Sequence, residues 1–322
     1  MLKRISPVPV NYFAIVLGLL GLGLSWRYGS NAGLLPAWPG HALLLTGAIL
    51  WFFLLCTYIY KWVCQKNAAL EELHHVIQCC FISLIPITTL LMGITVLPYS
   101  RVFSWLLLAA GIIGQLVFAA YRGGGLWRGT HVAEATTPII YLPAVAANFV
   151  CASAMGATGH LLWGTLFFGA GMLSWLSLEA AILHRLRTMQ TLAAAARPVI
   201  GIQLAPAFVG CAAYLSINGG GIDAIALALI GYGILQAIFL LRLLPWALEG
   251  GFTPSFWAFS FGLASMAGCG LRMITFYSKT GENDLLALGW GLFGMGTFCI
   301  VALIAFTLLF FIKKLQNHTV DA

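Results

Sequence analysis

The sequence predicts an all-α membrane protein with ten transmembrane helices, and three observations lead to this fold class. Hydrophobic residues make up 61% of the chain and charged residues only 8%, and the mean hydropathy is +0.95. A soluble domain of 322 residues could not keep so much apolar surface out of water. The apolar residues also fall into ten runs of about 20 residues, the length that crosses a bilayer, joined by short polar segments.

The ten predicted spans make up a single transmembrane domain over residues 1–322, embedded in the lipid bilayer. Because their number is even, both termini of the chain should lie on the same side of the membrane. The expected ranges are 11–28, 41–63, 80–97, 102–121, 138–157, 161–183, 199–217, 222–246, 256–277 and 285–312.

The basic residues predict which side that is, since Lys and Arg collect in cytoplasmic loops. Of the 16 basic residues, only Arg27, Arg101, Arg272 and Lys279 fall on the side opposite the N-terminus. The other twelve share its side, so both termini are predicted to be cytoplasmic. The formal charge of +7 is therefore mainly a topology signal. Basic residues scattered singly among membrane loops do not indicate nucleic-acid binding.

Prolines inside the spans predict how the helices are arranged. The third, fifth and seventh spans contain Pro86, Pro143 and Pro206, and Gly262 stands in place of a proline in the ninth. Proline removes a backbone donor and clashes with the preceding turn, so at membrane depth it is tolerated where protein or a water-filled cavity satisfies the freed carbonyl. We therefore expect five helical hairpins around a central pore, with kinked odd-numbered helices inside and even-numbered helices against lipid.

The side chains of the odd-numbered spans indicate what such a pore would carry. These spans contain almost no ionisable residues: Arg272 is expected at the membrane interface, and Glu179 belongs to an even-numbered span. A neutral lumen with basic residues at its cytoplasmic mouth favours anions, and the lack of an acidic ring argues against a cation filter. Hydroxyl and amide groups would offset part of the dehydration cost, and the candidate pore-lining residues are Thr88, Thr89, Asn148 and Ser265.

Long motifs follow one another along the chain in the order SLIPITTLLMG, EATTPIIYLPAVAANF, FGAGMLSWLSLE, IQLAPAF with YLSINGG, LLRLLPW and FWAFSFGLASMA. In this order they resemble the tellurite-resistance and dicarboxylate transporter family, which also contains the plant guard-cell slow anion channels, over about residues 7–312. The resemblance implies ten helices in five hairpins, with inner helices kinked at prolines around a pore. It further implies a homotrimer with one pore per protomer in the inner membrane of a bacterium.

The same resemblance implies a pore gate. The family places a phenylalanine in the ninth helix within the pattern aromatic residue, hydroxyl residue, Phe, then Gly or Pro, which here is Phe259, Ser260, Phe261 and Gly262. By this match Phe261 is the gate, and its ring would block dehydrated ions without carrying charge. The small residues after it would leave the ring room to change rotamer. Taken without the resemblance, ordinary packing of Phe261 against a neighbouring helix remains the alternative.

Two classes of function follow. The first is an anion channel, associated with tellurite resistance, that passes small inorganic anions and favours weakly hydrated nitrate over chloride. The alternative is a secondary transporter of C4-dicarboxylates or tellurium oxyanions, which would ordinarily need a titratable residue near the midplane. A membrane anchor for a soluble partner is a third reading, with residues 184–198 as the docking segment.

An enzyme, a cofactor and a metal site are not predicted. No nucleophile, base and orienting acid are placed where they could meet. The segment HHVIQCC contains His74, His75, Cys79 and Cys80, which resembles a soft-metal cluster. Adjacent side chains on a helix diverge by about 100°, however, so we expect a loop that leads into the third span.

Overall fold

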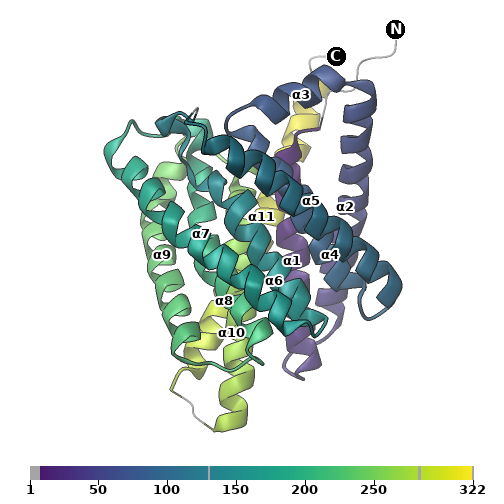
Figure 1. The fold of residues 1–322 in the computed structure, drawn as a ribbon, viewed down its shortest axis with the longest axis vertical. Helices are drawn as coiled ribbons and strands as arrows, with labels where there is room; N and C mark the ends of the chain where they lie inside the picture. The colour runs from purple at the N-terminus through teal and green to yellow at the C-terminus, as the bar shows by residue number, and fades with distance from the viewer. Residues whose placement is uncertain (1–7, 130, 282–283, 321–322) are drawn as a thin grey trace.

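The computed structural model describes residues 8–129, 131–281 and 284–320. In this part of the chain, ten helical stretches are long and apolar enough to cross a membrane. Their bounds are Val10–Asn31, Trp38–Cys64, Gln78–Val96, Arg101–Leu126, Pro138–Ala157, Leu161–Thr188, Ala194–Ile217, Ala224–Leu248, Pro254–Thr280 and Leu286–Gln316. The first stretch begins, and the tenth ends, at the same end of the bundle, which we call the terminal end; the opposite end is the distal end (Figure 1).

Each odd-numbered stretch ends in a regular α-helix, and each even-numbered stretch is one long α-helix. The inner α-helices are α1 (Phe13–Asn31), α4 (Leu84–Val96), α6 (Ala147–Ala157), α8 (Ala205–Ile217) and α10 (Ser260–Thr280). The outer α-helices are α2 (Trp38–Cys64), α5 (Arg101–Leu126), α7 (Leu161–Thr188), α9 (Ala224–Leu248) and α11 (Leu286–Val320). A short helix, α3 (Lys66–His74), lies at the terminal end (Figure 1).

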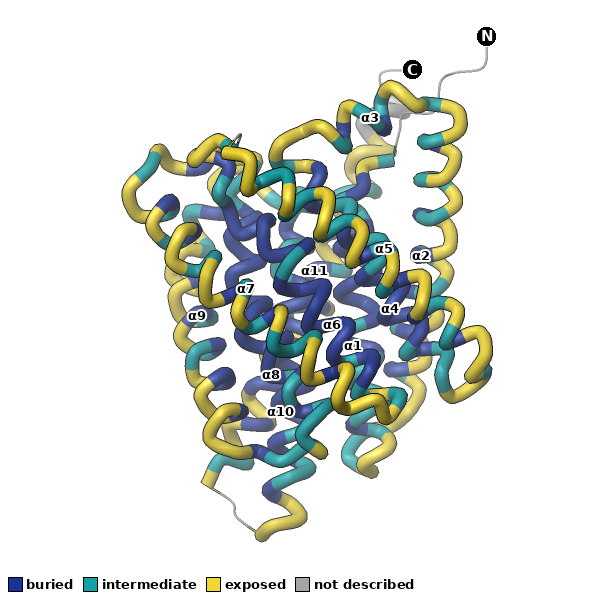
Figure 2. The backbone as a smooth tube through the Cα atoms, viewed as in Figure 1, coloured by how far each residue is buried: buried dark blue, intermediate teal, exposed yellow. Residues whose placement is uncertain are grey.

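Burial separates the two sets of helices. In the most apolar window of each odd-numbered stretch, 56% to 83% of the residues are buried, against 17% to 33% in the even-numbered ones. Figure 2 shows the same division, with buried backbone in the middle of the bundle and exposed backbone around it. The predicted alternation of inner and outer helices is therefore confirmed.

The inner helices form a closed ring. Each packs against two others, in the order α1, α4, α6, α8, α10 and back to α1, and against the outer helix that follows it in the chain. Glycines allow close approach within the hairpins: a Cβ atom on Gly171 of α7 would lie 2.8 Å from the Phe149 ring, and one on Gly233 of α9 would lie 2.8 Å from the Phe208 ring. Small residues at such contacts bring helix backbones together in membranes.

The inner stretches change helix type part-way across. A 3₁₀-helix runs over Gln78–Ser83 before α4, over Ala194–Leu204 before α8 and over Pro254–Phe259 before α10, and a π-helix covers Leu142–Ala146 before α6. These changes occur where the sequence places its prolines. Pro86 is the third residue of α4, Pro206 the second of α8 and Pro143 the second of the π-helix. Gly262 occupies the third position of α10, as Pro86 does in α4. A first turn tolerates proline because its N–H groups have no partner within the helix.

The segment HHVIQCC runs from the last residue of α3, through a turn, into the 3₁₀-helix that opens the third stretch. His74 and His75 are exposed, whereas Cys79 and Cys80 are buried in the 3₁₀-helix. The Nδ1 atom of His75 accepts hydrogen bonds from the backbone N–H groups of Ile77 and Gln78, at 3.2 and 3.1 Å. Within the described residues, no group of three or more His, Cys, Asp or Glu side chains is placed to hold a metal ion.

Candidate functional site

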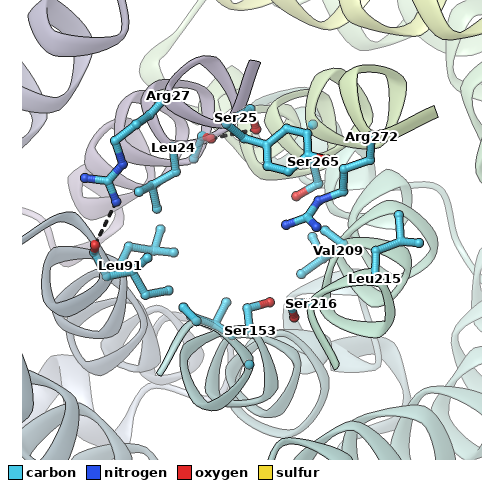
Figure 3. Close-up of a pocket in the computed structure, with 18 of the residues that line it drawn as sticks. Leu24, Ser25, Arg27, Leu91, Ser153, Val209, Leu215, Ser216, Ser265 and Arg272 are labelled. Carbon is cyan, nitrogen blue, oxygen red and sulfur yellow. Dashed lines mark hydrogen bonds between the residues drawn. The ribbon is translucent and has the colours of Figure 1, made fainter. Parts of the chain in front are cut away.

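A cavity of about 470 Å³ lies inside the ring, and all five inner helices line it. It occupies the distal half of the bundle, because its lining begins at Gly21 in α1 and at Phe261 in α10. It extends to Asn31 at the end of α1 and to Gly220 in the turn after α8. Figure 3 shows the lining side chains arranged around an open centre. The centre of the ring is therefore open on one side of Phe261.

One face of α10 follows the cavity along its length. Phe261, Ser265, Gly268 and Arg272 all line it, and their spacing of four, three and four residues places them on the same side of an α-helix. Phe261 is the second residue of α10 and is 7% exposed, so its ring lies at the deep end. Arg272 lies near the distal opening.

Two glycines close to Phe261, Gly21 and Gly262, have different structural roles. Gly21 of α1 faces the ring, since a Cβ atom there would lie 3.6 Å from Cδ2 of Phe261. Gly262 faces away from it, and a Cβ atom on Gly262 would lie 2.8 Å from the Cβ of Leu204. Gly262, which was expected to give the ring room, instead allows α10 to pack against the seventh stretch. The glycine that faces the Phe261 ring is Gly21 of α1. The sequence signal for such a neighbour was the group of glycines in the first span, Gly18, Gly21 and Gly23.

The cavity carries two guanidinium groups, which corrects the expectation of a neutral lumen. Arg27 and Arg272 both line it, and none of the lining residues that the structure describes is an Asp or Glu. Each arginine lies near the end of its span, and an arginine at such a position is typically expected at the membrane interface. Both arginines instead lie on the inner side of the ring, where the Arg272 guanidinium points to the open centre and that of Arg27 turns along the wall towards α4 (Figure 3). Among the described residues, the lining therefore has two formal positive charges and no formal negative charge.

The two guanidinium groups have different partners. Arg27 donates from Nη1 to the carbonyl oxygen of Thr95 and from Nη2 to that of Ile94, both at 2.8 Å. These carbonyls belong to the last turn of α4, where the helix dipole is negative. Arg272 lies over the ring of Tyr28, with 4.7 Å between Cζ and the ring centroid. Among the described residues, no acceptor takes a hydrogen bond from Arg272.

Of the four candidate pore-lining residues, only Ser265 lines the cavity. Thr88 and Thr89 donate to carbonyls of their own helix, to Leu84 at 2.7 Å and to Ile85 at 2.8 Å. The Nδ2 group of Asn148 donates to the Ala144 carbonyl, and its Oδ1 accepts from Gln115 of the outer helix α5, at 3.0 Å. The polar atoms of these three side chains bond to backbone carbonyls of their own stretch and to a neighbouring helix. The presence of polar residues on inner spans does not reveal these partners.

Glu179 is the only acidic residue in the ten candidate membrane spans, and it lies outside the cavity lining. Its Oε1 accepts from Tyr232 at 2.5 Å and from Gln203 at 2.9 Å; its Oε2 accepts from Trp175 at 2.8 Å and from Tyr141. These donors belong to α7, α9 and the non-α stretches before α6 and α8. The carboxylate therefore ties the inner ring to its outer layer.

Asp223, a second carboxylate, lies at the distal end beyond the cavity lining. Its Oδ2 accepts from Tyr214 at 2.6 Å, and its Oδ1 accepts from the backbone N–H groups of Ile225 and Ala226 at the start of α9. The hydrogen bond from Tyr214 and those from the backbone lower the pKa of Asp223. Asp223 is thus an ionised helix cap.

Residues 184–198, the docking segment of the anchor hypothesis, are tied to the protein body at two points. Arg185 is buried and donates to the backbone carbonyl of Glu134 at 3.1 Å. Arg197 pairs with Glu249 and lies over the Trp246 ring, 4.8 Å from its centroid.

A ring of five inner helices around a positively charged cavity defines a membrane protein of the channel or transporter class. The chain matches the SLAC1 family model, described as voltage-dependent anion channel, over residues 7–315, and it belongs to this family. It is 43% identical over 262 residues to the tellurite resistance protein TehA homolog of Haemophilus influenzae, covering 81% of this chain and 80% of that protein.

Two more distant relatives extend the comparison. The chain is 24% identical to the S-type anion channel SLAH3 of Arabidopsis thaliana over 94% of its own length, and it spans about half of that channel, 48%. It is 23% identical to the uncharacterized transporter MJ0576 of Methanocaldococcus jannaschii, over 79% of this chain and 80% of that protein. These two relatives are named as a channel and as a transporter, and the Haemophilus influenzae relative is named for tellurite resistance.

Proposed function

We propose that this protein is an anion channel of the bacterial inner membrane, gated by Phe261, and that its whole chain forms one membrane domain. The single observation that carries the proposal is the composition of the central cavity. Five inner helices line it, Phe261 lies at its deep end, and its described lining residues include two guanidinium groups and no carboxylate. Such a cavity concentrates small anions and repels cations, because field lines focus in a cleft with low-dielectric walls.

The proposed mechanism assigns one step to each part of the cavity. An anion enters from the distal end and exchanges part of its hydration shell for the guanidinium and hydroxyl groups of the lining. The Phe261 ring offers no hydrogen bond and fills the lumen, so the anion cannot continue while the ring stays in place. Side-chain rotamers exchange quickly in isolation, so the closed position depends on packing against α1, where Gly21 faces the ring.

Orientation, assembly and physiological role belong to the same proposal. The distribution of basic residues supports cytoplasmic N- and C-termini, which makes the distal end of the cavity its periplasmic end. The family relationship supports a homotrimer with one pore per protomer. The similarity to a protein named for tellurite resistance supports an association with that phenotype.

A secondary transporter of C4-dicarboxylates or tellurium oxyanions is the second candidate. The observation in its favour is the presence of two guanidinium groups in one cavity, since a dicarboxylate has two anionic groups to match. Against it stands the lack of a carboxylate or histidine to carry a coupling proton among the lining residues in the described ranges of the chain. The channel therefore remains the better supported function.

The test is anion conductance across planar bilayers containing purified protein, with Phe261→Ala compared with the unsubstituted protein. Removing the ring should raise the conductance at least about tenfold, because it deletes the main steric barrier. Phe298→Ala is the matched control, since this ring lies on α11 and is 71% exposed. A negligible current in all three proteins, together with saturable dicarboxylate uptake, would favour the transporter.

A further inference from the structure

The two guanidinium groups of the cavity are not equivalent. Both terminal nitrogens of Arg27 donate to carbonyls at the end of α4. Those carbonyls carry the partial negative charge of the helix terminus, which offsets the charge of the guanidinium. Arg27 therefore joins α1 to α4, with one N–H of each terminal nitrogen committed to a backbone carbonyl.

Arg272 has its charge and its hydrogen-bond donors available. Its contact is with the face of the Tyr28 ring, which orients the guanidinium plane but accepts no conventional hydrogen bond. Within the described chain, no carboxylate or carbonyl oxygen pairs with it. In Figure 3 the Arg272 guanidinium points to the open centre of the cavity, whereas that of Arg27 turns towards α4. Arginine has five N–H donors in a planar fork, and here the fork faces the lumen.

Ser265 completes a site with Arg272. It lies seven residues earlier, two turns away on the same face of α10, and its hydroxyl has no protein partner among the described residues. The other serines of the lining donate to backbone carbonyls: Ser25 to Gly21 and Ala264, Ser153 to Phe149 and Ser216 to Ala213. Gly268, between Ser265 and Arg272, adds no side chain to the space that separates them.

We propose that Arg272 and Ser265 bind one small monovalent inorganic anion in the distal half of the cavity, next to the Phe261 ring in the direction of permeation. The bound anion accepts from the guanidinium edge and from the Ser265 hydroxyl. A planar oxyanion such as nitrate matches the guanidinium fork with two parallel hydrogen bonds, whereas chloride accepts as a single point. This inference rests on the proposed function, because the site is the last one before the gate.

The first experiment measures the current carried by nitrate or chloride in the Phe261→Ala background at constant ionic strength. Adding Arg272→Gln should raise the anion concentration for half-maximal conductance about tenfold, the factor expected for a lost charge-assisted hydrogen bond. Arg101→Gln is the matched control, because Arg101 is an exposed arginine at the distal start of α5 and is not part of the cavity lining. Arg272→Lys keeps the charge but loses the planar fork. It should restore the half-saturation concentration of chloride more fully than that of nitrate.

The second experiment detects binding without current, with Phe261 intact. Nitrate should raise the Tm of the detergent-solubilised protein in proportion to its occupancy of the site. The shift should be lost in Arg272→Gln and Ser265→Ala and kept in Arg101→Gln. An equal shift in Arg272→Gln and Arg101→Gln would overturn the assignment.

The two experiments separate the site from the channel. A current through Phe261→Ala whose half-saturation does not respond to Arg272→Gln would overturn the site and leave the channel standing. An Arg272-dependent Tm shift without any current would overturn the channel and leave the anion site standing. Half-saturation that responds to Arg27→Gln but not to Arg272→Gln would show that the anion binds to the other guanidinium.

Discussion

Gly262 and Leu204 meet at a contact that leaves no space for a side chain. A Cβ atom on Gly262 would lie 2.8 Å from the Leu204 Cβ and 3.0 Å from the backbone nitrogen of Ala205. The contact joins the first turn of α10 to the point where the seventh stretch changes from a 3₁₀-helix to an α-helix. Since Phe261 is the residue just before Gly262 in α10, this contact fixes the depth of its ring in the cavity.

Gly262→Ala should therefore destabilise the fold. The added methyl group forces α10 away from the backbone of the seventh stretch, and overpacking of this kind costs about 1–3 kcal/mol. The measurement is the apparent Tm of the purified protein in detergent. Gly291→Ala provides the control, because a Cβ atom on Gly291 meets nothing within 4 Å. Equal Tm values for the two variants would mean that the contact relaxes freely.

Glu179→Gln should also lower the Tm. The amide offers one acceptor oxygen where the carboxylate offers two, and its NH₂ group would face the Trp175 and Tyr141 donors that now bond to Oε2. The expected cost is about 2 kcal/mol or more, since hydrogen bonds to charged groups are worth roughly 1.5–3 kcal/mol each. Glu249→Gln is the comparison, because its side chain is 60% exposed and a surface pair contributes about 0–1 kcal/mol. A smaller loss in Glu179→Gln than in Glu249→Gln would contradict this account.

Lys61 and Glu72 form a buried ion pair at the terminal end of the bundle. Their Nζ and Oε2 atoms lie 2.9 Å apart, with side chains 6% and 8% exposed, and Oε1 of Glu72 accepts from the backbone N–H of Val10. Lys61→Met leaves a carboxylate buried without its cation and should cost about 3–5 kcal/mol. The double variant Lys61→Met with Glu72→Leu should recover part of the loss, as a Tm series would detect. A double variant less stable than Lys61→Met would show that the Val10 hydrogen bond dominates.

The selectivity among anions should follow the hydration free energy that each anion loses when it is dehydrated. The lining offers one free guanidinium and few free hydroxyl groups, so it compensates lost hydration incompletely. Nitrate, which is weakly hydrated and matches the fork of Arg272, should permeate better than chloride. The measurement is the reversal potential of Phe261→Ala with nitrate on one side of the bilayer and chloride on the other. A potential that indicates preference for chloride would rule out this explanation.

The arrangement of helices could be predicted from the sequence because its cause is local. Pro86, Pro143 and Pro206 each remove a backbone donor at membrane depth, and that loss is best tolerated on helices that protein or a water-filled cavity shields from lipid. The positive charge of the cavity could not be predicted in the same way. Whether Arg27 or Arg272 faces lipid, a neighbouring helix or the axis depends on the rotation of each helix in a five-membered ring, which no single span encodes.

The candidate lining residues show the same limit. Thr88 and Asn148 lie on inner helices, as expected, but their polar atoms bond to neighbouring backbone and to Gln115. Ser265 lines the cavity because it is four residues from Phe261 on the same face of α10. The helical spacing from the proposed gate was therefore a better guide to the lining than polarity alone.

The most direct test of the central claim is the reversal potential of the Phe261→Ala current in a tenfold gradient of potassium chloride. The account predicts a potential close to the chloride equilibrium value, about 59 mV in magnitude for a monovalent ion, together with a much smaller current in the unsubstituted protein. A potential close to the potassium equilibrium value, or a current of equal size with and without the Phe261 ring, would contradict an anion channel gated by this residue.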